Sequence, residues 1–165
     1  MDSETLLSRI SEIAAEQGPR MDRLQRLAAT LRQSAGYRWV GLYDVDVTAG
    51  EVRNLVWDGP SAPEYPTFPI TKGLTGSAVA DKRTMNVGEV GADPRYLTAL
   101  DSTRSEIIVP ILNDRSQVVG TIDVESERPN AFDKDTEQLL ENCAVLLRPL
   151  FAEPERDQKI AGKER

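Results

Sequence analysis

Apolar residues recur at helical spacing near both ends of the chain. Residues 3–17 and 21–35 each follow the i, i+3, i+4, i+7 rhythm of an amphipathic helix. A third helix is predicted over residues 133–151, where Asp133 can cap the first turn and Pro149 should kink or end the last one. The apolar positions that define the first helix are Leu6, Leu7, Ile10, Ile13 and Ala14.

Between these helices the pattern changes to the alternation that is typical of strands. One further helix is predicted at residues 74–81, and a long connection at 91–103. The predicted strands are residues 37–45, 51–57, 65–70, 84–90, 104–112 and 117–126. This order of elements predicts an α+β domain with an antiparallel sheet and with the terminal helices packed together.

The last two strands form a hairpin that gives the most information about function. We place its turn at residues 113–116, so that Leu112 lies opposite Gln117. Because side chains alternate along a strand, one face of this hairpin is then wholly apolar. That face consists of Ile107, Val109, Ile111, Val118, Gly120 and Ile122.

The opposite face carries Glu106, Asp123 and Glu125. In the predicted register Glu106 lies opposite Asp123, and Arg104 lies opposite Glu125. Like charges that face each other across a ladder are destabilising, so these acids need a reason to be there. We interpret them as a site for a small ligand with a cationic or hydrogen-bond-donating group.

A solvated sheet face is the alternative interpretation, since antiparallel sheets often keep one face in water. Two observations favour a ligand site instead. The acids gather at the end of the hairpin away from the turn, with Arg104 as a potential partner among them. Apolar residues also share the acidic face, namely Ile108, Pro110, Leu112 and Val119.

Composition limits the partners and the compartment. The 165 residues include 20 basic and 27 acidic side chains, for a formal net charge of -7. This balance argues against nucleic acid and against anionic membrane surfaces. No apolar run reaches a membrane-spanning length, and no secretory signal precedes the first helix. A single cysteine fits a reducing cytoplasm.

We expect one domain over residues 1–151 and a polar, disordered tail over residues 152–165.

Candidate catalytic groups are few. The chain has no histidine, and Cys143 falls on the apolar stripe of the last helix, as expected for a structural thiol. A pair of acids without a nucleophile or a metal is weak support for catalysis. Three carboxylates on one hairpin supply few of the oxygens that calcium requires. The sequence therefore predicts no catalytic residue, no metal and no cofactor.

Four motifs, in order along the chain, resemble the GAF domain family. They are Arg38–Tyr43 (RWVGLY), Gly73–Gly76 (GLTG), Asp101–Glu106 (DSTRSE) and Val119–Ser126 (VGTIDVES). The resemblance covers nearly the whole chain. It implies a six-stranded antiparallel sheet, with the N- and C-terminal helices packed on one face and a ligand pocket on the other.

Within that family the motifs are most similar to the free methionine-(R)-sulfoxide reductase branch. The resemblance implies that Trp39, Tyr43, Glu106, Asp123 and Glu125 surround the ligand, with Glu125 where an aspartate is usual. Trp39 and Tyr43 are four residues apart on a strand and so share a face. Ordinary core packing is the alternative role for both aromatic residues.

The chain departs from that branch at the residues that perform the chemistry. The branch reduces sulfoxides with cysteine thiolates, and the matching positions here are Thr75, Leu100 and the region of Tyr65. We therefore expect a non-catalytic, cytoplasmic sensor module for a polar, amino-acid-like ligand. A diverged reductase-like enzyme and a scaffold with a vestigial pocket are the alternatives. A homodimer through the terminal helices, and a separate signalling partner, are expected partners.

Overall fold

The computed structural model describes residues 1–97 and 100–151. The predicted tail, residues 152–165, lies outside these described residues. The helices are α1 (Ser3–Ala15), α2 (Arg20–Ala35), α3 (Gly73–Asp81) and α4 (Lys134–Phe151), with a 3-10 turn η1 (Val90–Ala92). The strands are β1 (Trp39–Asp46), β2 (Glu51–Asp58), β3 (Thr67–Pro69), β4 (Met85–Val87), β5 (Ser105–Leu112) and β6 (Val118–Ser126).

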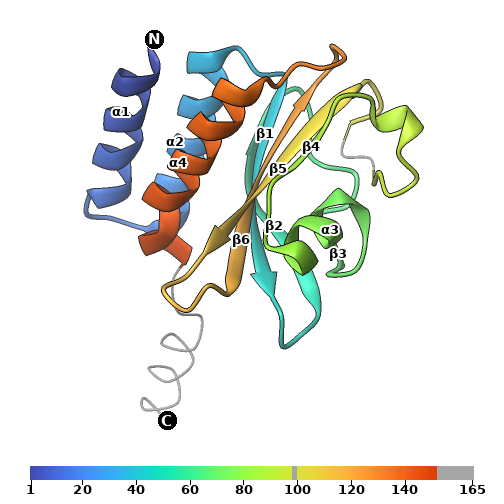
Figure 1. The fold of residues 1–165 in the computed structure, drawn as a ribbon. Coiled ribbons are helices and arrows are strands. Elements are labelled where there is room, and N and C mark those ends of the chain that lie inside the picture. The colour runs from blue at the N-terminus through green and yellow to red at the C-terminus, as the bar shows by residue number, and fades with distance from the viewer. Residues whose placement is uncertain (98–99, 152–165) are drawn as a thin grey trace.

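The strands form one six-stranded sheet in the order β3-β2-β1-β6-β5-β4, and every neighbouring pair is antiparallel. Helices α1, α2 and α4 lie on one side of this sheet, whereas α3 lies on the other (Figure 1). The predicted α+β architecture, with the terminal helices on one face, is confirmed.

Helices α1 and α4 each begin where an aspartate side chain satisfies a free backbone N–H group. Asp2 Oδ1 accepts a hydrogen bond from the Thr5 backbone N–H at 2.8 Å, and Asp133 Oδ1 accepts one from Thr136 at 2.8 Å. The last helix continues through Pro149 to Phe151, so Pro149 does not end it. The apolar stripes of α1, α2 and α4 pack together with one face of the sheet to form the largest core cluster.

The register of the β5–β6 hairpin differs from the predicted one by two residues. Glu106 lies opposite Glu125, and Asp123 lies opposite Ile108. Arg104 does not pair with Glu125, because its guanidinium Nη2 lies 2.8 Å from Glu89 Oε2. From Gly120 onward the shift is two residues, which preserves the face of each side chain, so the three acids still share one face.

A turn one residue longer than predicted and a bulge next to it together explain the shift of two residues: Leu112 lies opposite Val118, and Ile111 lies opposite Gly120. The Asn113 backbone N–H donates to the Gln117 carbonyl, Ser116 has φ 59°, and the pairing is irregular between Ile111 and Leu112. The bulge also reverses the faces predicted for two residues. Val119 packs with the helices, and Val118 packs on the opposite face of the sheet.

Among the described residues, no helix is long and apolar enough to cross a membrane.

Candidate functional site

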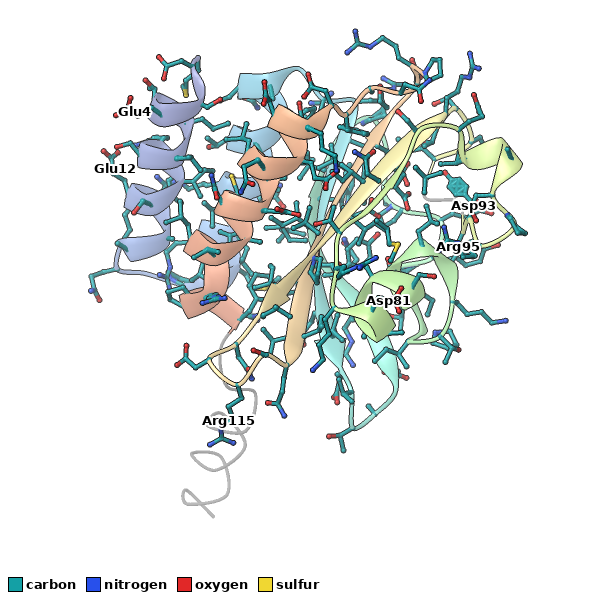
Figure 2. All side chains as sticks on the ribbon, in the orientation of Figure 1. Glu4, Glu12, Asp81, Asp93, Arg95 and Arg115 are labelled. Atoms are coloured by element: carbon teal, nitrogen blue, oxygen red, sulfur yellow. The ribbon has the colours of Figure 1, made fainter. Side chains whose placement is uncertain are left out.

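Three carboxylates meet on the side of the sheet opposite the terminal helices. Glu106 comes from β5, whereas Asp123 and Glu125 come from alternate positions of β6. They are exposed by only 3%, 5% and 0%, and one oxygen from each lies within 4.8 Å of the others. Figure 2 shows the interior between the sheet and α3 filled with side chains. The predicted cluster of acids is therefore present, and it is buried.

Burial determines the electrostatics of this cluster. Desolvation, with the neighbouring carboxylates Asp123 and Glu125, holds the pKa of Glu106 well above its ordinary value. Desolvation and Glu125 raise the pKa of Asp123 in the same way. Glu106 Oε2 and Asp123 Oδ1 have no hydrogen-bond partner in the part of the chain that the structure describes. Carboxylic acids in such a site favour protons or a cationic partner.

Two aromatic residues of β1 stand beside the acids. The rings of Trp39 and Tyr43 are 6.4 Å apart between centroids, and the two residues are exposed by 0% and 2%. Trp39 Nε1 donates to the Ser61 carbonyl at 3.0 Å. Burial, then the nearby acids with Asp123 first, raises the pKa of Tyr43 well above its ordinary value. Tyr43 therefore stays a neutral phenol beside the acids.

A small cavity of about 20 Å³ opens between the acids and α3. It is lined by Tyr43, Tyr65, Phe68, Gly73, Leu74, Thr75, Leu97, Glu106 and Asp123. This volume accommodates about one water molecule. A larger ligand requires movement of the segments that cover the cavity, which include Tyr65 and Leu97. Trp39 and Glu125 are not part of its lining.

Two threonines that sequence reasoning missed belong to this site. Thr121 is fully buried, and its Oγ1 has no hydrogen-bond partner within the described residues. Thr103 donates its hydroxyl to Glu125 Oε2 at 2.5 Å. The alternation of β6 places Thr121 on the face of Asp123, so the sequence held a signal for it. Thr103 lies in the connection before β5, within the DSTRSE motif, but the sequence assigned it no role of its own.

Comparisons with known proteins agree with this architecture. The family model described as GAF domain matches residues 20–148. The chain belongs to the GAF domain family. GAF domain-containing protein A of Dictyostelium discoideum is 28% identical over 144 residues, which cover 87% of this chain and 89% of that protein.

This GAF domain also has relatives among the sulfoxide reductases. The free methionine-R-sulfoxide reductase of Saccharomyces cerevisiae is 31% identical over 111 residues, which cover 66% of this chain and 60% of that protein. The structure of free methionine-R-sulfoxide reductase from Neisseria meningitidis, in complex with its substrate, is similar with a TM-score of 0.83 and 31% identity. That match covers 94% of this chain and 91% of the other. The resemblance stated from the motifs is confirmed.

The GAF domain has no thiol at the cavity. Thr75 and Tyr65, which the resemblance places at or near cysteine positions of the reductase branch, line the cavity. Leu100, at the third position, packs in the same apolar cluster as Trp39 and Tyr43. Cys143 lies in α4, within the cluster on the opposite face of the sheet. Burial raises the pKa of its thiol to about 12, so it is a structural side chain.

Proposed function

We propose that this GAF domain is a non-catalytic sensor that binds a small, polar, amino-acid-like ligand. The supporting observation is the pair of unpartnered, buried carboxyl oxygens, Glu106 Oε2 and Asp123 Oδ1, on residues that line the cavity. Buried polar groups are almost always hydrogen-bonded. The Glu106 carboxyl has a hydrogen bond with Glu125 within the chain, so the need for a further donor is clearest at Asp123 Oδ1. A protonated amine on a small ligand supplies both the charge and the donors.

The ligand class follows from the chemistry of the walls. The acids accept hydrogen bonds from a cationic head, whereas Tyr43 and Phe68 provide an apolar surface for a short side chain. The similar free methionine-R-sulfoxide reductase from Neisseria meningitidis was solved in complex with its substrate. An amino acid is larger than the present cavity of about 20 Å³, so its binding requires Tyr65 and Leu97 to move.

Direct binding tests the proposal. A thermal-shift screen would use amino acids, both methionine sulfoxide epimers and polyamines. A ligand at a hundred times its dissociation constant adds about 2.7 kcal/mol to the free energy of unfolding. We expect Glu106→Gln with Asp123→Asn to weaken a hit about tenfold or more, because each substitution removes a charged acceptor.

The matched control is Glu4→Gln with Glu12→Gln. It also removes two acidic groups, but these lie on the outer face of α1 (Figure 2). This control should bind as the unmodified protein does. Equal affinity of the pocket variant and the control for every ligand found would contradict the proposal.

A diverged reductase is the second candidate, and similarity to two enzymes of that name favours it. It requires a thiol at the substrate, and the one cysteine of the chain, Cys143, is buried across the sheet. We expect no reduction of free methionine sulfoxide with dithiothreitol as the reductant. Turnover that persists in Cys143→Ser would show a different chemistry on the same pocket, whereas turnover that Cys143→Ser abolishes would restore the reductase.

The wider setting of this sensor is also a proposal. We infer a cytoplasmic location from the single cysteine. Occupancy of the pocket would be reported to a separate signalling partner through the terminal helices, which pack on the other face of the same sheet (Figure 1). If no ligand stabilises the protein, the scaffold with a vestigial pocket becomes the better description.

A further inference from the structure

A second and larger hollow lies away from the acidic pocket, between α4 and the open edge of β5. Its volume is about 550 Å³, in the range of small-molecule sites. Strand β4 pairs with β5 only as far as Ile108, so the part of β5 beyond it borders this groove. The groove is lined by Lys82, Arg83, Thr84, Val109, Pro110, Leu112, Lys134, Glu137, Glu141, Ala144, Val145 and Arg148.

The charge of this groove is opposite to that of the chain. Four cations and two acids line it, although the chain as a whole has a net charge of -7. Both acids already have partners. Glu137 accepts from Asn86 at 3.1 Å and from Lys134 at 3.2 Å, and Glu141 accepts from Thr84 at 2.7 Å.

The other three cations lack an ion-pair partner among the described residues, and Glu141, whose partner Thr84 is neutral, offsets only one of their charges. Within residues 1–97 and 100–151, Lys82, Arg83 and Arg148 form no ion pair. The three therefore offer a positive surface to an anion.

Arg148 and Lys82 each have an unusual local structure in addition to their charge. Arg148 Nε is buried and has no acceptor within the described chain, which is uncommon for a charged donor. Lys82 ends α3 in the left-handed conformation with φ 53°, which is unfavourable for a residue with a Cβ. The dipole of α4 favours a cation in its last turn but leaves the desolvated Nε without an acceptor. Arg148 also lines the groove and is only half-buried, so an anion there can pair with the part of the guanidinium that is not buried.

The floor of the groove decides what kind of anion fits. Val109, Pro110 and Val145 line it, but the first two are buried, so its accessible apolar surface comes mainly from Val145, which is 52% exposed. Pro110 has no N–H, which makes the addition of a peptide strand to this edge unfavourable. We propose that the groove binds a small organic anion. Its carboxylate or phosphate pairs with Arg148, Arg83 and Lys82, and its apolar part lies on the floor.

Binding of four defined probes tests this assignment. Phenyl phosphate, inorganic phosphate, benzoate and acetate would be titrated into the protein at constant ionic strength, with calorimetry and backbone amide NMR as readouts. We expect the aromatic anions to bind more tightly than their small counterparts. Amide shifts should concentrate at residues 82–84 and 144–148. The better of phenyl phosphate and benzoate identifies the anionic group.

Charge-removing variants make the test specific. Arg148→Gln and Arg83→Gln should each weaken the best probe about tenfold or more, as loss of a charge-assisted hydrogen bond implies. Arg83 is exposed, so its variant remains informative if Arg148→Gln is unstable. The matched control is Arg115→Gln, in the turn between β5 and β6 (Figure 2), which should bind normally.

Three results would overturn the proposal. The first is equal weakening in Arg115→Gln, which would show non-specific charge attraction. The second is the absence of localised shifts with every probe at tens of millimolar. The third is a loss of self-association in Arg83→Gln without any probe binding, which would assign the groove to a second copy of the chain.

Discussion

The buried acids predict an unusual dependence of stability on pH. Glu106 and Asp123 have native pKa values raised well above their ordinary values of 4.5 and 3.8. The folded protein therefore keeps protons that the unfolded chain has already lost. Unfolding releases protons, so the stability contributed by these two groups is complete below about pH 4. It is lost as the pH rises through their native pKa values.

Removing the two charges should stabilise the protein at neutral and alkaline pH. We expect Glu106→Gln with Asp123→Asn to raise the free energy of unfolding by about 1–4 kcal/mol at pH 8, and by less at pH 5. Urea unfolding at the two pH values measures the difference. Glu4→Gln with Glu12→Gln, both exposed, should change it by less than about 0.5 kcal/mol at either pH. A gain that is equal at both pH values would contradict raised native pKa values.

Gly41 allows the two aromatic residues of β1 to share one face. A Cβ there would lie 2.3 Å from the Trp39 ring and 2.9 Å from the Tyr43 ring. Both rings are buried, so neither can move away freely. We expect Gly41→Ala to lower the free energy of unfolding by about 1–3 kcal/mol, as overpacking does. Thermal unfolding measures this change.

Gly91→Ala is the control for this substitution, because its Cβ would come no closer than 3.7 Å to another side chain. Comparable destabilisation by the two alanines would show that glycine flexibility, and not the packing of Trp39 and Tyr43, explains the loss.

At the level of residues, alternation along the strands was enough to group Glu106, Asp123 and Glu125. It could not show their depth, since burial depends on the loops that cover the sheet. The proposed partner Arg104 was wrong for the same reason, because Glu89 reaches it from another segment. The ligand-contacting role of Trp39 stays a prediction.

At the scale of elements, Asn113 controls the β5–β6 hairpin. Its Oδ1 accepts from the backbone N–H groups of Arg115 at 2.9 Å and Gln117 at 3.0 Å. Asn113→Ala removes both bonds, so we expect a loss of about 1–2 kcal/mol in a urea titration. Asp114→Ala, at the exposed neighbouring position, should have little effect. An unchanged midpoint for Asn113→Ala would mean that the bulge is held by the strands alone.

The same turn separates what the sequence predicts about the elements from what it does not predict. The helices and central strands follow from periodicity alone, because α1, α2 and α4 each bury one apolar stripe. The register does not, because a shift of two residues leaves the acids on the same face and so gives the same pattern of alternation. The register of the hairpin depends instead on the turn, in which Ser116 adopts φ 59°, and on the bulge beside Leu112. The strands β3 and β4 are shorter than predicted, and both lie at sheet edges.

At the scale of the whole molecule, the sheet separates two environments. Its helix side is an apolar core that includes Cys143, and its other side holds the acids and their aromatic neighbours. Strands β5 and β6 connect them, because their side chains alternate between the two sides. Helix α3 reaches from the acidic cavity, at Thr75, to the groove, at Lys82. The two proposed sites therefore share one rigid element.

The homodimer through the terminal helices is a prediction that concerns the whole molecule. Leu6, Ile10 and Ile13 of α1 are exposed by 2%, 0% and 1%, so the stripe that predicted a bundle is filled within the chain. A stable interface buries about 1,200–2,000 Å² in total. The outer face of α1 instead presents acids such as Glu4 and Glu12 (Figure 2).

We therefore expect any dimer through this face to be weak, because two chains of net charge -7 repel each other. Sedimentation velocity at micromolar concentration should give a monomer of 18.3 kDa. Higher salt should favour association, since it screens the repulsion. A dimer that persists at low micromolar concentration and low salt would contradict this expectation. Loss of that dimer in Glu4→Lys with Glu12→Lys, but not in Arg115→Gln, would then place the interface on α1.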